Sequence, residues 1–255
     1  MDSLDKKTYY FCNSECTKQD FLKYAANQID NEKISVIHHA SSQNFTHITD
    51  AMEFDSILKK YGISPAKNRQ YIFSFCTAEP RKNLVFTVEC FIKFIKKHNI
   101  TNLYFYFGGG HWNDFLKKIE KKINTFGNYK DKIIRLGYID DIDVNAFYSN
   151  SLFFTYISQY EGFGVPPLEA MMAGTPVITS NNSSLPEVVG DAAITIEYNN
   201  EEQCIKAFEG LYFNKDLRTQ YIAKGLERAK LFSWEKTVQC MTETITKACE
   251  NETGA

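Results

Sequence analysis

The sequence predicts an α/β fold built on a parallel sheet, because short β-branched and aromatic runs alternate with amphipathic segments along its 255 residues. Several of these runs are apolar almost throughout, which is typical of strands that helices cover on both faces. Strands are therefore expected at residues 8–12, 34–38, 71–76, 103–107, 133–136, 152–156, 176–180 and 193–196.

The amphipathic segments between these runs predict the helices. In residues 83–97, an apolar residue recurs at Leu84, Val88, Phe91 and Ile95, which is the spacing of one helix face. Lysines surround the apolar stripe of residues 114–124, which favours a solvated face, with contact to anionic lipid as the alternative. Further helices are expected at residues 17–26, 52–61, 166–173, 185–189, 201–212, 216–231 and 234–250.

A polar stretch between Ala40 and Gln70 divides the chain, and its last part, GISPAKNRQ, is typical of a linker. The residues before it form one strand–helix–strand unit that is too small to fold alone. Regular alternation of strands and helices follows the stretch. The sequence therefore predicts three parts: residues 1–45, residues 46–235, and a C-terminal helix and tail in residues 236–255.

Composition excludes several classes of protein. A formal net charge of −2 gives no overall field that would attract nucleic acid, so no nucleic-acid partner is expected. The seven cysteines are scattered and lack zinc-site spacing, so they are interpreted as reduced thiols rather than as zinc ligands. The N-terminus has no apolar core typical of a signal peptide, and the longest apolar runs are too short to span a bilayer. A cytoplasmic protein is expected, with at most peripheral contact at the inner face of the membrane.

The richest motif, EGFGVPPLE, follows the strand expected at residues 152–156. Gly162 and Gly164 allow a sharp turn close to a ligand, and the prolines suit the first turn of a helix whose free amides could bind phosphate. Glu161 and Glu169 could both face one crevice, where a carboxylate accepts two hydrogen bonds from a sugar diol. The alternative for Glu169 is that it only complements the helix dipole.

A second motif, EPRKN, opens the helix after the strand expected at residues 71–76. Arg81 and Lys82 lie beside a helix N-terminus, where cations are unfavourable, so an anionic partner such as a diphosphate would resolve the conflict. The alternative is two solvated surface cations. The glycine run before His111 does not have dinucleotide-binding spacing, and His111 is interpreted as a loop residue rather than a base.

Together these motifs resemble the retaining glycosyltransferases of family 4, which use nucleoside-diphosphate sugars on a GT-B fold. The resemblance covers almost the whole chain and is carried by EGFGVPPLEAMMAGTPVITSNNSSLPEVVGDAA, TAEPRKNL, FYFGGGHW, IIRLGYIDD and FSWEKTVQ. It implies a Rossmann-like, doubly wound parallel sheet in residues 46–235 as the donor-binding C-terminal lobe. Residues 1–45 would be a remnant of the N-terminal acceptor lobe.

The resemblance also implies roles for individual residues. Glu161, Arg81 and Lys82 would be catalytic, the two cations holding the diphosphate and stabilising charge on the leaving group in place of a metal ion. Glu169 would bind the ribose. The donor would also contact the loop residues Gly162, Phe163, Gly164 and Val165, and the base would lie against Gly137, Tyr138 and Ile139.

Two positions depart from the family pattern. Many members have glycine where Cys76 stands, so the cysteine is expected to narrow the donor cleft, and many have arginine where Thr77 stands. The resemblance implies transfer of a hexose from a nucleotide sugar to a saccharide or lipid-linked acceptor, in polysaccharide or glycoconjugate biosynthesis. The alternative is a non-catalytic donor-binding subunit that needs a separate acceptor lobe. An epimerase is disfavoured, because its pattern lacks this pair of motifs.

Overall fold

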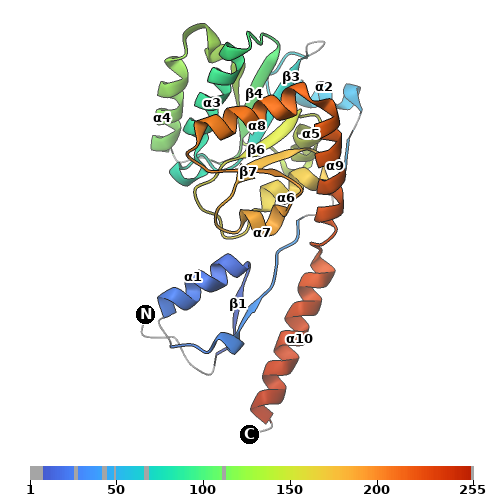
Figure 1. Cartoon of the computed structure of the whole chain (residues 1–255). Helices are drawn as coiled ribbons and strands as arrows, with labels where there is room; N and C mark the ends of the chain where they lie inside the picture. The colour runs from blue at the N-terminus through green and yellow to red at the C-terminus, as the bar shows by residue number, and fades with distance from the viewer. Residues whose placement is uncertain are drawn as a thin grey trace.

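The computed structural model describes residues 8–25, 28–41, 45–48, 50–65, 69–110 and 113–253. The remaining positions, which include His111 and part of the expected linker, lie outside the described residues. The chain forms a large α/β body, a small N-terminal unit and a long C-terminal helix (Figure 1).

The centre of the large body is a parallel sheet of six strands in the order β5-β4-β3-β6-β7-β8. Numbered along the chain within this sheet, the order is 3-2-1-4-5-6, the doubly wound Rossmann order. This confirms the predicted fold class. The strands are β3 (Gln70–Phe75), β4 (Leu103–Gly108), β5 (Ile133–Gly137), β6 (Phe153–Tyr156), β7 (Val177–Ser180) and β8 (Ile194–Ile196).

Helices cover both faces of the sheet, as the apolar strands predict. Neighbouring strand residues point to opposite faces, so Phe153 packs with α3 and α8 on one side while Phe154 packs with α5 and α6 on the other. The helices of the body are α2 (Ala51–Lys60), α3 (Leu84–Lys97), α4 (Asn113–Asn124), α5 (Asp141–Ser149), α6 (Val165–Met172), α7 (Leu185–Val189), α8 (Glu201–Phe213) and α9 (Lys215–Ala229). Short 3₁₀ turns occur at η1 (Asn31–Lys33), η2 (Pro80–Lys82) and η3 (Gly127–Lys132).

Every expected strand and helix is present, with ends shifted by a few residues, but the sequence prediction missed one helix, α5. Six consecutive residues of α5, from Asp143 to Tyr148, are buried. A helix that is enclosed on most sides shows no separate polar and apolar faces, so its sequence lacks the stripe on which the other helices were predicted.

The N-terminal unit consists of β1 (Tyr10–Cys12), α1 (Glu15–Ala25) and β2 (Ile34–Val36), and its two strands pair in parallel. It has a small apolar cluster of its own around Ile34. Helix α10 (Trp234–Thr253) extends from the body on the same side as this unit (Figure 1). Thr237 of α10 donates a hydrogen bond to the carbonyl of His38, 2.8 Å away. Within the described residues, no helix is both long and apolar enough to cross a bilayer.

Candidate functional site

The strand order reverses between β3 and β6, and the two richest sequence motifs follow these two strands. Pro80–Lys82 form η2 soon after β3, and Glu161 lies in the loop after β6. In doubly wound sheets, ligands bind outside the carboxyl ends of the strands at such a reversal. The fold therefore brings the motifs to the position where a binding crevice is expected.

Arg81, Lys82 and Glu161 form one cluster of charges. Lys82 Nζ lies 2.6 Å from Glu161 Oε1, and Arg81 Nη1 lies 2.8 Å from Glu161 Oε2. Lys82 Nζ also donates a hydrogen bond to the hydroxyl of Tyr156, 2.5 Å away. The side chains of Lys82 and Glu161 are only 9% and 8% exposed, so their geometry is fixed by packing.

A second carboxylate balances the cluster. Arg81 Nη2 lies 2.7 Å from Glu79 Oε1, and Glu79 is buried. The two cations beside the start of a helix therefore already have two anionic partners within the chain. The alternative of two solvated surface cations is wrong for Lys82 and describes Arg81 only in part, because its exposed fraction is 45%.

The Glu161 carboxyl is held in its ionised form. Burial alone would raise its pKa, but the Lys82 ammonium and hydrogen bonds from Lys82, Ser158 and Arg81 together lower the pKa below its ordinary value. A carboxylate that is ionised and acceptor-only can receive hydrogen bonds from sugar hydroxyls.

A cavity of about 450 Å³ opens beside this cluster. Its wall includes Lys82, Glu161 and the loop from Gly162 to Pro166. Among the described residues, no acceptor takes a hydrogen bond from the amides of Gly162, Phe163 or Gly164. Backbone amides without partners, next to a lysine, make a wall that suits an anion.

Helix α6 itself adds fewer donors than its position suggests, because Pro166 and Pro167 in its first turn have no N–H group. Gly164 precedes the helix with φ of +113°, and a Cβ atom there would lie 2.8 Å from Leu185 Cδ2. The turn that exposes the loop amides therefore requires glycine at this position.

Glu169 lines a different cavity, of about 830 Å³, next to α5. Its Oε2 accepts a hydrogen bond from Tyr148 at 3.0 Å, and its Oε1 accepts one from Ser41 at 3.2 Å. Burial raises the pKa of Glu169, and these two hydrogen bonds offset only part of that effect. Both cavities are lined by Phe75, so the two acids expected in one crevice lie in adjoining spaces.

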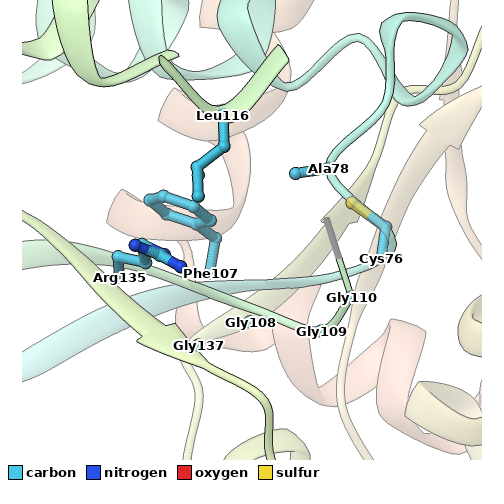
Figure 2. Close-up of a pocket in the computed structure, with 9 residues that line it drawn as sticks. All are labelled: Cys76, Ala78, Phe107, Gly108, Gly109, Gly110, Leu116, Arg135 and Gly137. Atoms are coloured by element: carbon cyan, nitrogen blue, oxygen red, sulfur yellow. The ribbon is translucent and has the colours of Figure 1, made fainter. Parts of the chain in front are cut away.

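The three residues expected around a base are placed differently from one another. Gly137 lines a pocket of only about 10 Å³, shown in Figure 2, which is too small for more than a water molecule. The Tyr138 side chain is 71% exposed, and Ile139 is buried in the core. None of the three is among the described residues that line the two larger cavities.

Cys76 separates the small pocket from the 450 Å³ cavity and lines both. Burial raises the pKa of its thiol to about 12, so the side chain is a neutral group in the wall of both spaces. Thr77, the second position that departs from the family pattern, lines the same 450 Å³ cavity.

The N-terminal unit also reaches the site, which sequence reasoning missed. Asn13 and His39 line the 450 Å³ cavity. Ser14 and Thr17 donate hydrogen bonds to the carbonyl of Gly162, at 2.7 Å and 3.2 Å. Sequence reasoning also missed Tyr156, although its position at the end of strand β6 could have indicated it. The contacts of Ser14 and Thr17 join distant segments of the chain, so they leave no local pattern in the sequence.

One acidic side chain ties the N-terminal unit to the body. Glu187 of α7 accepts hydrogen bonds from the Glu15 amide at 2.9 Å and 3.0 Å, and it lies 2.6 Å from His38 Nε2. Within the part of the chain that the structure describes, no group of three or more side chains could hold a metal ion.

Comparisons with known proteins agree with this architecture. O-antigen chain mannosyltransferase B of Escherichia coli is 31% identical over 247 residues, which are 96% of this chain and 61% of that protein. A glycosyltransferase from Rickettsia africae ESF-5 superposes with a TM-score of 0.81 at 22% identity, covering 96% of this chain and 65% of that one. Anabaena Alr3699/HepE, solved in complex with UDP and glucose, gives a TM-score of 0.79 at 16% identity, covering 94% of this chain and 63% of that one.

These structural neighbours are GT-B glycosyltransferases and share the parallel six-stranded α/β fold. The chain spans about 61% of the length of the Escherichia coli relative. The model of the family described as glycosyl transferases group 1 matches residues 55–228, which is more than half of the chain. The chain therefore belongs to the glycosyl transferases group 1 family.

Proposed function

We propose that this chain binds a nucleoside-diphosphate sugar and takes part in transferring its hexose to an acceptor hydroxyl with the anomeric configuration retained. The observation that carries the proposal is the Arg81–Lys82–Glu161 cluster at the strand reversal, beside a cavity of about 450 Å³. In this cluster the Glu161 carboxylate would accept hydrogen bonds from the sugar hydroxyls, and the two cations would bind the diphosphate. The sugar and the diphosphate are the two sides of the bond that breaks.

The diphosphate would lie in the 450 Å³ cavity, against the loop amides from Gly162 to Gly164 and Lys82 Nζ. Negative charge grows on the leaving diphosphate as its bond to the anomeric carbon breaks, and fixed cations stabilise that charge most strongly in the transition state. Arg81 and Lys82 would supply this stabilisation in place of a metal ion. Glu161 would exchange part of its cationic contact for hydrogen bonds from the sugar hydroxyls.

The nucleoside would extend past Phe75 into the 830 Å³ cavity, where Glu169 would accept hydrogen bonds from the ribose diol. Tyr148 and Ser41 hold the Glu169 carboxyl from behind, so its orientation is set before a ligand arrives. Glu161 would bind the sugar and Glu169 the ribose, and these two groups lie on opposite sides of the diphosphate. Two adjoining cavities therefore suit a nucleotide sugar better than one shared crevice would.

The names of two relatives support a hexose donor in saccharide synthesis, and the acceptor proposed here is a saccharide or a lipid-linked saccharide. One is named an O-antigen chain mannosyltransferase, and another was solved with UDP and glucose. Such an acceptor would place the reaction at the inner face of the membrane.

A second candidate is a donor-binding unit that needs a separate acceptor lobe or subunit. The same cluster and cavity would bind a nucleotide sugar in such a unit, since they form the donor site without any acceptor contact. Nucleotide binding without turnover would distinguish this candidate from a complete transferase.

Isothermal titration of the full chain with GDP, UDP and ADP tests the proposal. At least one nucleotide is expected to bind, and Lys82→Ala and Arg81→Ala should each weaken its binding at least about tenfold, as for a lost charged hydrogen bond. Lys93→Ala is the control, because Lys93 pairs with Glu201 on the surface, away from both cavities. Absence of binding by all three nucleotides would refute the proposal. For the transfer step, incubation of donor sugar with saccharide acceptors and proton NMR of the new anomeric centre tests retention.

A further inference from the structure

Three consecutive carbonyl groups in the loop after β6 are held by hydroxyl groups from other parts of the chain. Ser184 Oγ lies within hydrogen-bonding distance of the carbonyl oxygens just before and just after Gly162, at 2.9 Å and 2.7 Å. The Gly162 carbonyl itself accepts from Ser14 and Thr17, at 2.7 Å and 3.2 Å. The body therefore holds two of these carbonyls, and the N-terminal unit holds the one between them.

The Gly162 carbonyl keeps a donor whichever way the hydroxyl protons point. Ser14 Oγ also lies 3.0 Å from Thr17 Oγ1, so its single proton can go to the carbonyl or to Thr17. In the first case both hydroxyls donate to the carbonyl, and in the second case Thr17 still does. Ser14 is fully buried, so water hardly competes for these hydrogen bonds.

Ser14 has a second task, which does not use its proton. It precedes α1, and its Oγ accepts a hydrogen bond from the Thr17 amide at 3.0 Å, as the cap of a helix does. Capping needs only an acceptor oxygen, so the proton stays available to the loop. The contact with Gly162 is therefore not a requirement of the helix.

The N-terminal unit packs directly on the backbone of Gly162. A Cβ atom there would lie 3.4 Å from Asn13 Nδ2 and 3.9 Å from Thr17 Oγ1. Asn13 and Gly162 both line the 450 Å³ cavity. This contact thus lies at the cavity wall, where the orientation of one peptide decides which donors a ligand meets.

Holding the Gly162 carbonyl also orients the amide of Phe163, which belongs to the same peptide. The C=O and N–H groups of a trans peptide point in opposite directions, so this amide points away from Ser14 and Thr17. Among the described residues, no acceptor binds it. Glycine restricts its own backbone only loosely, so the orientation of this peptide depends on hydrogen bonds from outside the loop.

We propose that Ser14 and Thr17 are positioning residues that hold the Phe163 amide in place for an anionic ligand in the 450 Å³ cavity. They act through the Gly162 carbonyl rather than by contact with the ligand. An amide that is already fixed binds a phosphate without first being ordered, and this raises affinity. The inference rests on the proposed function, because it takes the ligand to be a nucleoside diphosphate.

Calorimetric titration of the full chain with GDP, UDP and ADP tests the inference, with the nucleotide that the wild type binds most tightly used for the variants. Ser14→Ala combined with Thr17→Val removes both donors and should weaken binding at least about tenfold, as for a lost hydrogen bond to a charged group. Thr17→Val alone should weaken it about threefold. Thr17→Ser keeps the hydroxyl and should bind within about twofold of the wild type.

Thr237→Val is the matched control. It removes another hydroxyl of similar environment, whose hydrogen bonds go to the carbonyls of His38 and Ser233, so binding should stay within about twofold of the wild type. Melting without ligand checks that each variant is folded. If the double variant does not fold, the comparison of Thr17→Val with Thr17→Ser decides.

Three results would overturn the inference and leave the proposed function standing. The first is a folded double variant that binds as tightly as the wild type, or, where it does not fold, a Thr17→Val variant that does so. The second is a Thr17→Ser variant that binds as weakly as Thr17→Val. The third is a Thr237→Val variant that is weakened as much as Thr17→Val. Failure of every nucleotide to bind the wild type would overturn both proposals.

Discussion

The buried ion pair between Lys82 and Glu161 makes a specific prediction about stability. Lys82→Met keeps a side chain of similar length but removes the charge. The exposed fractions of the two partners are 9% and 8%, so the variant leaves a carboxylate that water barely reaches. The ligand-free chain should therefore be destabilised well beyond the effect of an ordinary surface change.

The size of the effect follows from the remaining partners of Glu161. Removing one ion of a fully buried pair costs about 3–5 kcal/mol. Arg81 still contacts the other carboxylate oxygen, but its side chain is 45% exposed and its charge is partly screened. We therefore expect Lys82→Met to lower the free energy of unfolding by about 2–3 kcal/mol. Adding Glu161→Gln removes the stranded charge, so the double variant should recover most of that loss.

Urea denaturation of the full chain, followed by circular dichroism, measures both variants. Lys93→Met is the matched control, because its pair with Glu201 is about half exposed on both sides and should contribute less than about 1 kcal/mol. The reasoning fails if Lys82→Met is no more destabilising than Lys93→Met. It also fails if the double variant is less stable than Lys82→Met alone.

Three further predictions concern the same site. Glu169→Gln should stabilise the ligand-free chain at neutral pH while weakening nucleotide binding. Burial raises the pKa of Glu169 in the folded chain, so the stability of the wild type relative to the variant should fall as the pH rises through that pKa. Urea titrations at several pH values check this. Glu79→Gln should tighten nucleoside-diphosphate binding roughly two- to fivefold in calorimetry, because it frees Arg81 from one of its two carboxylates; unchanged or weaker binding would contradict this. Gly164→Ala should cost about 1–3 kcal/mol of stability in urea, because its φ is +113° and a leucine blocks the Cβ, whereas Gly210→Ala, in a helix with ordinary contacts, should stabilise the chain or leave it unchanged.

Most of the fold could be predicted because its strands carry a strong local signal. Strand β6, for example, lies in a run of aliphatic, aromatic and β-branched residues from Leu152 to Ile157 with a serine at either end, and helices such as α3 have one clear apolar face. Helix α5 lacked that signal because the body encloses it. Burial of most of its surface stabilises α5 and also removes the apolar stripe from which the helix could have been predicted.

The site was predictable where it depends on position along the chain. Arg81, Lys82 and Glu161 each follow a strand, and the carboxyl ends of parallel strands meet at one edge of the sheet. The partners of these groups depend on packing between distant segments. Glu79 completes the cluster, and Asn13 reaches the cavity from far along the chain, so neither followed from spacing alone.

The balance of charge in the cluster has a kinetic consequence. Two carboxylates and two cations, all linked by contacts of 2.6–2.8 Å, cancel at a distance, although each keeps its full charge at contact. The summed charge of the cluster is close to zero, so the cluster exerts little attraction on a distant anion. At 0.1 M ionic strength, salt also screens attraction beyond about 10 Å. The association rate of a nucleotide sugar should therefore vary little with ionic strength, and selectivity should come from how long the ligand stays bound.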